Sequence, residues 1–109
     1  MNQRLQKNAV SDSALAQLRV PPHSIEAEQS VLGGLLLDNQ AWDRMGDLVT
    51  DGDFYRDEHR RIFRQIRNLL ERSRPADVVT VSEALDAAGE GDQTGGLAYL
   101  GELTANTPS

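Results

Sequence analysis

Apolar residues recur at helical spacing along most of the chain, and the first such run follows Ser24. Its members are Ile25, Val31, Leu32, Leu35 and Leu36. Ser24 is a favourable N-cap, and Glu26 and Glu28 place negative charge in the first turn, where the helix dipole stabilises it. Gly33-Gly34 interrupts the run. The interpretation we favour is close approach of a crossing helix over a surface without side chains, and the alternative is a hinge or a ligand contact.

Four more apolar patterns follow and predict an all-α fold. They are Ala41, Trp42, Met45, Leu48 and Val49; then Tyr55, His59, Ile62, Phe63, Ile66, Leu69 and Leu70; then Val81, Ala84, Leu85 and Ala88; and last Leu97, Leu100 and Leu103. Thr80-Val81-Ser82-Glu83 matches a capping box, so the fourth helix is expected to start near Val81. Residues 78–81 are the only strand candidate. We expect a compact orthogonal bundle of about five to six helices.

Residues 1–20 differ from this helical region. They are mostly polar, contain no aromatic residue, and are separated from the rest by Pro21-Pro22. Ordering a backbone costs about 1–2 kcal/mol per residue, and this segment has little apolar surface to offset that cost. The predicted organisation is therefore a disordered arm over residues 1–20 and a helical domain over residues 21–109.

Composition indicates a cytoplasmic protein and argues against catalysis. The chain has no cysteine, no apolar run near the ~20 residues that span a bilayer, and no apolar segment typical of a signal peptide. A phosphate-binding loop needs a lysine inside the motif, and the single lysine is Lys7, in the predicted arm. With only His23 and His59 as histidines, no metal site is expected. We interpret His59, on an apolar helix face, as a packed core histidine, and we predict no catalytic residues and no cofactor.

Positive charge is concentrated in one helix. Residues 56–74 hold seven arginines and three acidic residues, a net +4, whereas the whole chain carries −6. Arg56, Arg60, Arg64 and Arg67 share one stripe beside the apolar face. The interpretation we favour is a solvated edge whose aliphatic stems cover the core. The alternative is an electrostatic contact to an acidic partner or a nucleic-acid backbone, although an excess of acidic residues is unusual for nucleic-acid-binding domains.

Several blocks of the sequence resemble the N-terminal domain of the DnaB family of bacterial replicative DNA helicases. They are PPHSIEAEQSVLGG at residues 21–34, Asp53-Phe54-Tyr55 with His59 and Ile62-Phe63, DVVTV at 77–81 with Glu83 and Leu85, and GGLAYL at 95–100 before Thr107-Pro108-Ser109. The blocks occur in the order and at the spacing of the family, and the resemblance covers about residues 20–109.

The resemblance implies a collar subdomain rather than an enzyme. In this family a helical globule and a following hairpin form the collar of a hexamer, and a linker connects it to an ATPase motor that uses ATP and Mg²⁺ and contacts DNA. The implied partners are the C-terminal domain of DnaG primase, other DnaB subunits and, as a further candidate, a helicase loader. Hairpin, linker and motor are expected to lie outside this sequence, so ATP hydrolysis and unwinding are not expected of it.

Two residues are candidates for partner contact in addition to the arginine stripe. Tyr99 falls off the face made by the last three leucines, so its ring is expected to be partly exposed, and tyrosine is common at interface hot spots. Glu26 follows Ile25 in the first turn, with its carboxylate free to face outward. The structural alternatives are edge-of-core packing for Tyr99 and dipole stabilisation for Glu26. A stand-alone nucleic-acid-binding domain that uses Arg56, Arg60, Arg64 and Arg67 is the alternative function.

Overall fold

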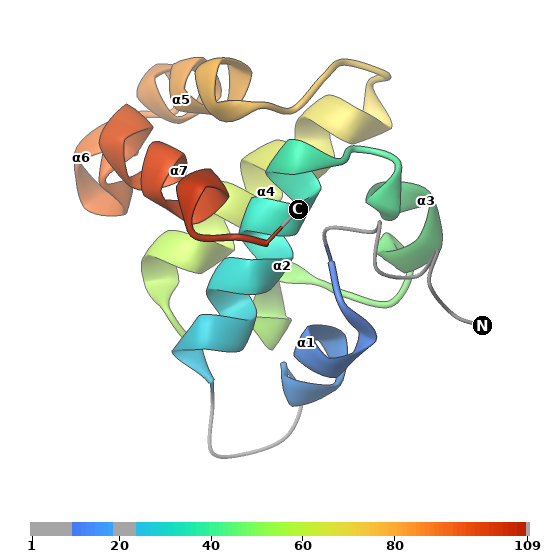
Figure 1. Ribbon diagram of the computed structural model, residues 1–109. Helices are drawn as coiled ribbons and strands as arrows, with labels where there is room; N and C mark the ends of the chain where they lie inside the picture. The colour runs from blue at the N-terminus through green and yellow to red at the C-terminus, as the bar shows by residue number, and fades with distance from the viewer. Residues whose placement is uncertain (1–9, 19–23, 109) are drawn as a thin grey trace.

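The computed structural model describes residues 10–18 and 24–108, and regular structure in these residues is entirely helical (Figure 1). The elements are α1 (Asp12–Gln17), α2 (Ile25–Leu37), α3 (Ala41–Met45), the 3₁₀ turn η2 (Asp51–Asp53), α4 (Asp57–Glu71), α5 (Val78–Ala87), α6 (Gly91–Thr94) and α7 (Gly96–Ala105). The predicted all-α class is confirmed. Among the described helices, none combines the length and apolar character needed to cross a bilayer.

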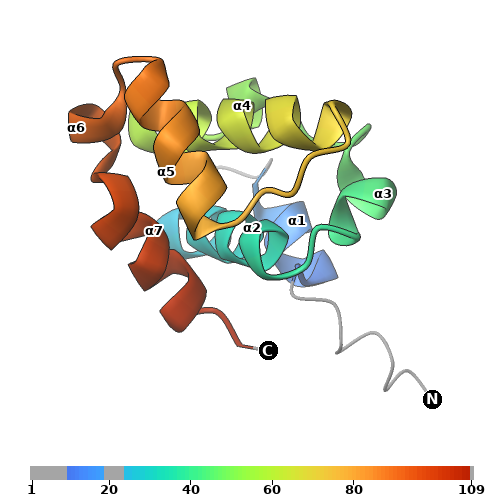
Figure 2. The same ribbon diagram turned by 90° about the horizontal axis from the view of Figure 1, so that it is seen from above.

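Helix α2 is the centre of the bundle. Helices α1, α4 and α7 all pack against it, and α5 packs across α4 and α7 (Figures 1 and 2). Val31, Leu32 and Leu35 of α2 are fully buried and meet Ile62, Phe63 and Ile66 of α4, Leu85 of α5 and Leu100 of α7 in one apolar core. The tertiary arrangement therefore places α7 beside α2, although about sixty residues separate them along the chain.

The predicted entry and crossing of α2 are confirmed. The Ser24 hydroxyl accepts a hydrogen bond from the Ala27 amide at 3.1 Å, as an N-cap does. A Cβ atom added at Gly33 would lie 2.5 Å from the Leu103 carbonyl oxygen and would also overlap the Thr107 hydroxyl. Gly33 thus lets the end of α7 approach the backbone of α2, which is the close helix crossing that the glycine pair indicated.

The start of α5 differs from its prediction. The helix begins at Val78 rather than near Val81, because Asp77 is the N-cap. The Asp77 carboxylate accepts from the amides of Val79 and Thr80, both at 2.9 Å, and the Thr80 hydroxyl accepts from the Asp77 amide at 2.8 Å. This pair satisfies the free amides of the first turn better than Thr80 with Glu83 would, and it makes the strand candidate helical.

Four apolar positions also lie outside the faces predicted for them, and one of these is Ala88, the exposed C-cap of α5. Helix α3 ends at Met45, so Leu48 falls in a turn and is 52% exposed. Tyr55 precedes α4 and is 58% exposed, and Leu97 in the first turn of α7 is 54% exposed. In each case the helix is shorter than the apolar pattern, or its end projects beyond the neighbouring helices, so spacing alone overestimates the buried face.

Residues 10–18 belong to the segment that was predicted to be a disordered arm, and they include helix α1. Val10, Ala14 and Leu18 are buried and join the core, while the Ser11 hydroxyl caps α1 by accepting from the Ala14 amide at 3.0 Å. Arg44 of α3 donates to the Val10 carbonyl at 2.7 Å. The apolar face of α1 is short, and α2 supplies the surface that makes its burial favourable. Residues 1–9 and 19–20 of the predicted arm lie outside the described residues.

Candidate protein-interaction surface

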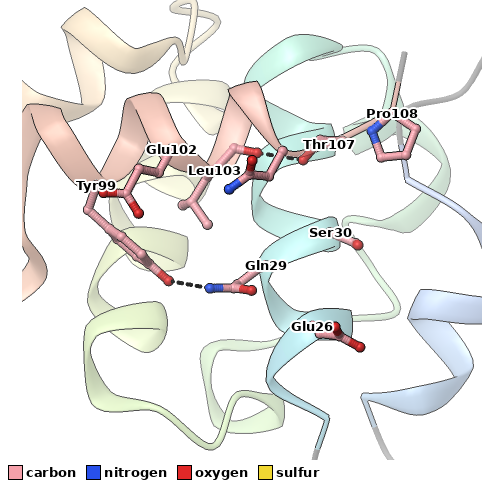
Figure 3. A pocket seen from close by; sticks show the side chains of 9 residues that line it. Glu26, Gln29, Ser30, Tyr99, Glu102, Leu103, Thr107 and Pro108 are labelled. Carbon is pink, nitrogen blue, oxygen red and sulfur yellow. Dashed lines mark hydrogen bonds between the residues drawn. The ribbon is translucent and has the colours of Figure 1, made fainter.

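A groove of about 480 Å³ runs between α2 and α7 (Figure 3). Its lining residues are Glu26, Gln29 and Ser30 from α2, Tyr99, Glu102 and Leu103 from α7, and Asn106, Thr107 and Pro108 that follow α7. Glu26 and Glu102 are exposed, so the rim of the groove is acidic. The sequence-predicted residues Glu26 and Tyr99 therefore line the same surface.

Glu26 and Tyr99 have different roles in the geometry of this groove. The Glu26 carboxylate points outward from the first turn of α2, as the sequence predicted, whereas Gln29 points across the groove to Tyr99 (Figure 3). The Tyr99 ring is half-buried and packs against the core, while its edge lines the groove. Expected partial exposure and edge-of-core packing are thus both present in Tyr99.

Behind Tyr99, a buried chain of hydrogen bonds joins three helices. The Tyr99 hydroxyl accepts from Gln29 Nε2 at 3.1 Å and lies 2.6 Å from His59 Nε2 of α4. The other imidazole nitrogen, Nδ1, lies 2.7 Å from Glu28 Oε1. His59 is fully buried, so the interpretation of His59 as a packed, hydrogen-bonded core histidine is confirmed.

Glu28 is the residue of this network that sequence reasoning missed. Its role was interpreted as dipole stabilisation, but the side chain is only 1% exposed. Besides His59, the Glu28 carboxylate accepts from the backbone amides of Tyr55 at 2.6 Å and Arg56 at 3.3 Å, immediately before α4. One signal could have revealed it: Glu28 lies three positions from Ile25 and from Val31, on the apolar face of α2.

A second, shallower groove of about 360 Å³ lies on the other side of Tyr99. Arg56, Glu58, Ala98 and Glu102 line it together with Tyr99 and residues 93–95.

Burial raises the pKa of the Tyr99 hydroxyl, and the Gln29 hydrogen bond and the charge of Arg56 oppose this effect. The hydrogen bond from Arg56 lowers the pKa of Glu58 and raises that of Arg56 itself. Of the arginine stripe, Arg56 is the member that shares a groove with Tyr99.

The rest of the arginine stripe is bound by groups of the same chain. Arg60 donates from Nε to the Phe54 carbonyl at 2.7 Å. Arg64 Nε lies 2.8 Å from Asp51 Oδ2, and Arg67 Nη1 lies 4.0 Å from Asp51 Oδ1. These contacts attach η2 and the loop after it to α4. The favoured interpretation of a solvated edge fits this geometry better than a continuous cationic surface does.

The Glu28–His59–Tyr99 chain has residue types that also occur in acid–base catalysis, but its geometry is that of a core network. Both imidazole nitrogens are occupied by protein partners, and His59 has no exposed surface for a substrate. Within residues 10–18 and 24–108, no three histidine, aspartate or glutamate side chains are grouped so that they could hold a metal ion. The Glu28–His59–Tyr99 network therefore connects α2, α4 and α7.

Comparison with known proteins identifies the family. The family model for the DnaB-like helicase N terminal domain matches residues 20–109. The replicative DNA helicase DnaB of Haemophilus influenzae is 48% identical over 99 residues, covering 91% of this chain and 21% of that protein. The DnaB of Pasteurella multocida is 46% identical over 104 residues, covering 94% of this chain and 22% of the relative. The chain thus spans about a fifth of the length of these relatives.

A solved structure supports the same assignment. The crystal structure of the N-terminal domain of DnaB helicase from Mycobacterium tuberculosis matches with a TM-score of 0.78 at 41% identity, covering 83% of this chain and 62% of that one. The sequence comparison and the fold comparison therefore agree. The chain belongs to the family of DnaB-like helicase N-terminal domains.

Proposed function

We propose that this chain acts as part of the collar of a hexameric replicative helicase in the cytoplasm, where it helps to hold the subunits and receives the C-terminal domain of DnaG primase. The relatives that it matches are replicative DNA helicases, of which it spans about a fifth. ATP hydrolysis, Mg²⁺ binding and movement along DNA belong in this proposal to a motor outside the present sequence. A helicase loader is a second candidate partner for the same surface.

The observation that carries the proposal is the α2–α7 groove. It presents a half-buried tyrosine, Tyr99, whose position is fixed by hydrogen bonds, and an acidic rim made by Glu26 and Glu102. A rigid aromatic side chain provides contact area at low entropic cost, and it is enriched among the residues that dominate interface energies. The acidic rim favours a partner segment that carries lysine or arginine beside an apolar side chain.

The geometry does not favour the alternative of a nucleic-acid-binding domain. Such a domain needs arginines that are free to replace the counterions of phosphates. Here Asp51 neutralises Arg64 and contacts Arg67, and Glu58 binds Arg56. Titration of single-stranded DNA at increasing salt separates the two functions, because phosphate binding weakens steeply with salt. We expect no salt-sensitive binding by this domain.

The test of the proposed function uses a full-length helicase that carries this sequence as its N-terminal region. Tyr99→Ala removes the ring from the groove, and Glu26→Ala removes one charge from its rim. We expect Tyr99→Ala to weaken the affinity for the primase C-terminal domain by about 2 kcal/mol, as hot-spot truncations do, and Glu26→Ala by less than about 1 kcal/mol. Calorimetric titration measures both.

Matched controls are available on the same molecule. Glu83→Ala removes an exposed glutamate of α5, and Leu97→Ala removes an exposed apolar side chain of α7; neither residue lines the groove. Both controls are expected to bind the primase domain like the parent. If Tyr99→Ala and Glu26→Ala also bind like the parent, with unchanged melting temperature, the groove is not the docking surface.

A further inference from the structure

We propose that Gln29 and His59 are positioning residues for Tyr99, and that the hydrogen-bonded chain from Gln29 to Glu28 sets the place of the tyrosine ring between the two grooves. This inference rests on the proposed function, since it assigns how the groove presents its aromatic contact. Gln29 comes from α2 and His59 from α4, so side chains of two different helices hold the hydroxyl of a side chain on α7.

Counting protons gives the chain one consistent direction. Gln29 Nε2 donates to the Tyr99 oxygen, and the single hydroxyl proton is then free to be donated to His59 Nε2. The imidazole keeps its proton on Nδ1 and donates it to the Glu28 carboxylate, which also accepts the amides of Tyr55 and Arg56. The described residues contain no buried side-chain nitrogen or oxygen without a partner. Such chains strengthen each of their hydrogen bonds.

The hydrogen-bonded network matters for binding because of the position of Tyr99. Its ring lines the groove with Glu26 on one side and the groove with Arg56 on the other. The planes of the Tyr99 and His59 rings differ by only 9°, with centroids 5.8 Å apart, so the hydroxyl contact also sets the tilt of the tyrosine ring. A ring that is held before the partner arrives loses less conformational freedom on binding. Without these hydrogen bonds, the binding partner has to order the same ring.

The experiment is a double-mutant cycle in the full-length helicase, with the primase C-terminal domain as titrant. Tyr99→Phe keeps the ring but removes the hydroxyl, and Gln29→Leu removes the donor at similar volume. We expect about tenfold weaker binding for Tyr99→Phe and about threefold for Gln29→Leu, the scale of one or two hydrogen bonds. Because Gln29 acts through the hydroxyl, the double variant is expected to bind like Tyr99→Phe alone.

A matched control is Gln65→Leu, which makes the same change at a half-buried position of α4 away from both grooves. It is expected to leave affinity unchanged. The inference is overturned if Tyr99→Phe and Gln29→Leu bind like the parent, or if their effects add to about 30-fold, which indicates direct contact of Gln29 with the partner. In those cases a loss of binding in Tyr99→Ala still supports the proposed function. Parent-like binding by both Tyr99→Ala and Glu26→Ala contradicts the proposed function and this inference together.

Discussion

On each of two sides of α4, a basic side chain contacts a carboxylate from another segment. The surroundings of the two contacts differ. On one side, His59 is completely buried between Glu28 of α2 and Tyr99 of α7. On the other, Arg64 and Arg67 reach Asp51 at the surface, where about a third of each side chain stays exposed. Distances are similar, near 2.7–2.8 Å for the shorter contacts. Burial therefore decides how much each contact is worth.

The two contacts differ in energy because a group that loses its partner is solvated at the surface but not in the core. At the surface, water and salt ions solvate a carboxylate or a guanidinium that has lost its pair, so an exposed ion pair contributes about 0–1 kcal/mol. In the core, the remaining group keeps the full cost of its removal from water, which is several times larger. The first side of α4 is thus a determinant of the fold and of the groove, and the second attaches a loop.

The largest effect is expected from His59→Ala. It leaves Glu28 buried with only two backbone amides as partners, and it removes the acceptor of the Tyr99 hydroxyl. We expect a loss of about 3 kcal/mol in the free energy of unfolding, measured by chemical denaturation. A loss below about 1 kcal/mol would show that water enters the site and that the contrast between the two sides of α4 is wrong.

An intermediate effect is expected from Gly33→Ala, which tests the helix crossing that forms the groove. The added methyl group would press on the Leu103 carbonyl and the Thr107 hydroxyl, so α7 has to move away from α2. We expect a net loss of about 1–2 kcal/mol, since overpacking exceeds the gain in helix propensity. Gly101→Ala is the control: an added Cβ at Gly101 meets nothing within 4 Å. It is expected to stabilise α7 by about 0.5–1 kcal/mol.

The smallest effect is expected from Asp51→Asn, which weakens the contacts to Arg64 and Arg67 without changing side-chain volume. These contacts are partly exposed, so we expect less than about 1 kcal/mol, and we expect the difference from the parent to shrink in 1 M salt. Thermal unfolding at low and high salt measures both. A salt-independent loss near that of His59→Ala would mean that Asp51 acts as a buried structural group.

Much of the fold could be predicted from the sequence because helical periodicity is a local property. The apolar spacing that leads from Ile62 to Ile66 predicted α4, and Ser24 marked the entry of α2. Short helices were harder to predict from the sequence. Helix α1 and its flanking residues bury only Val10, Ala14 and Leu18 fully, with Leu15 partly buried, and the contact of α1 with α2 is contained in no local pattern.

The candidate site divides in the same way. Residue type and helix phase alone indicated that Tyr99 and Glu26 reach the surface and that His59 belongs to the core. Only the tertiary structure decided that Tyr99 and Glu26 line one groove, that Glu28 faces inward, and that Asp51 binds the arginines of α4. Periodicity determines which face of a helix is apolar. Which side chains meet depends on how helices distant in sequence cross, and that is set by the packing of the whole core.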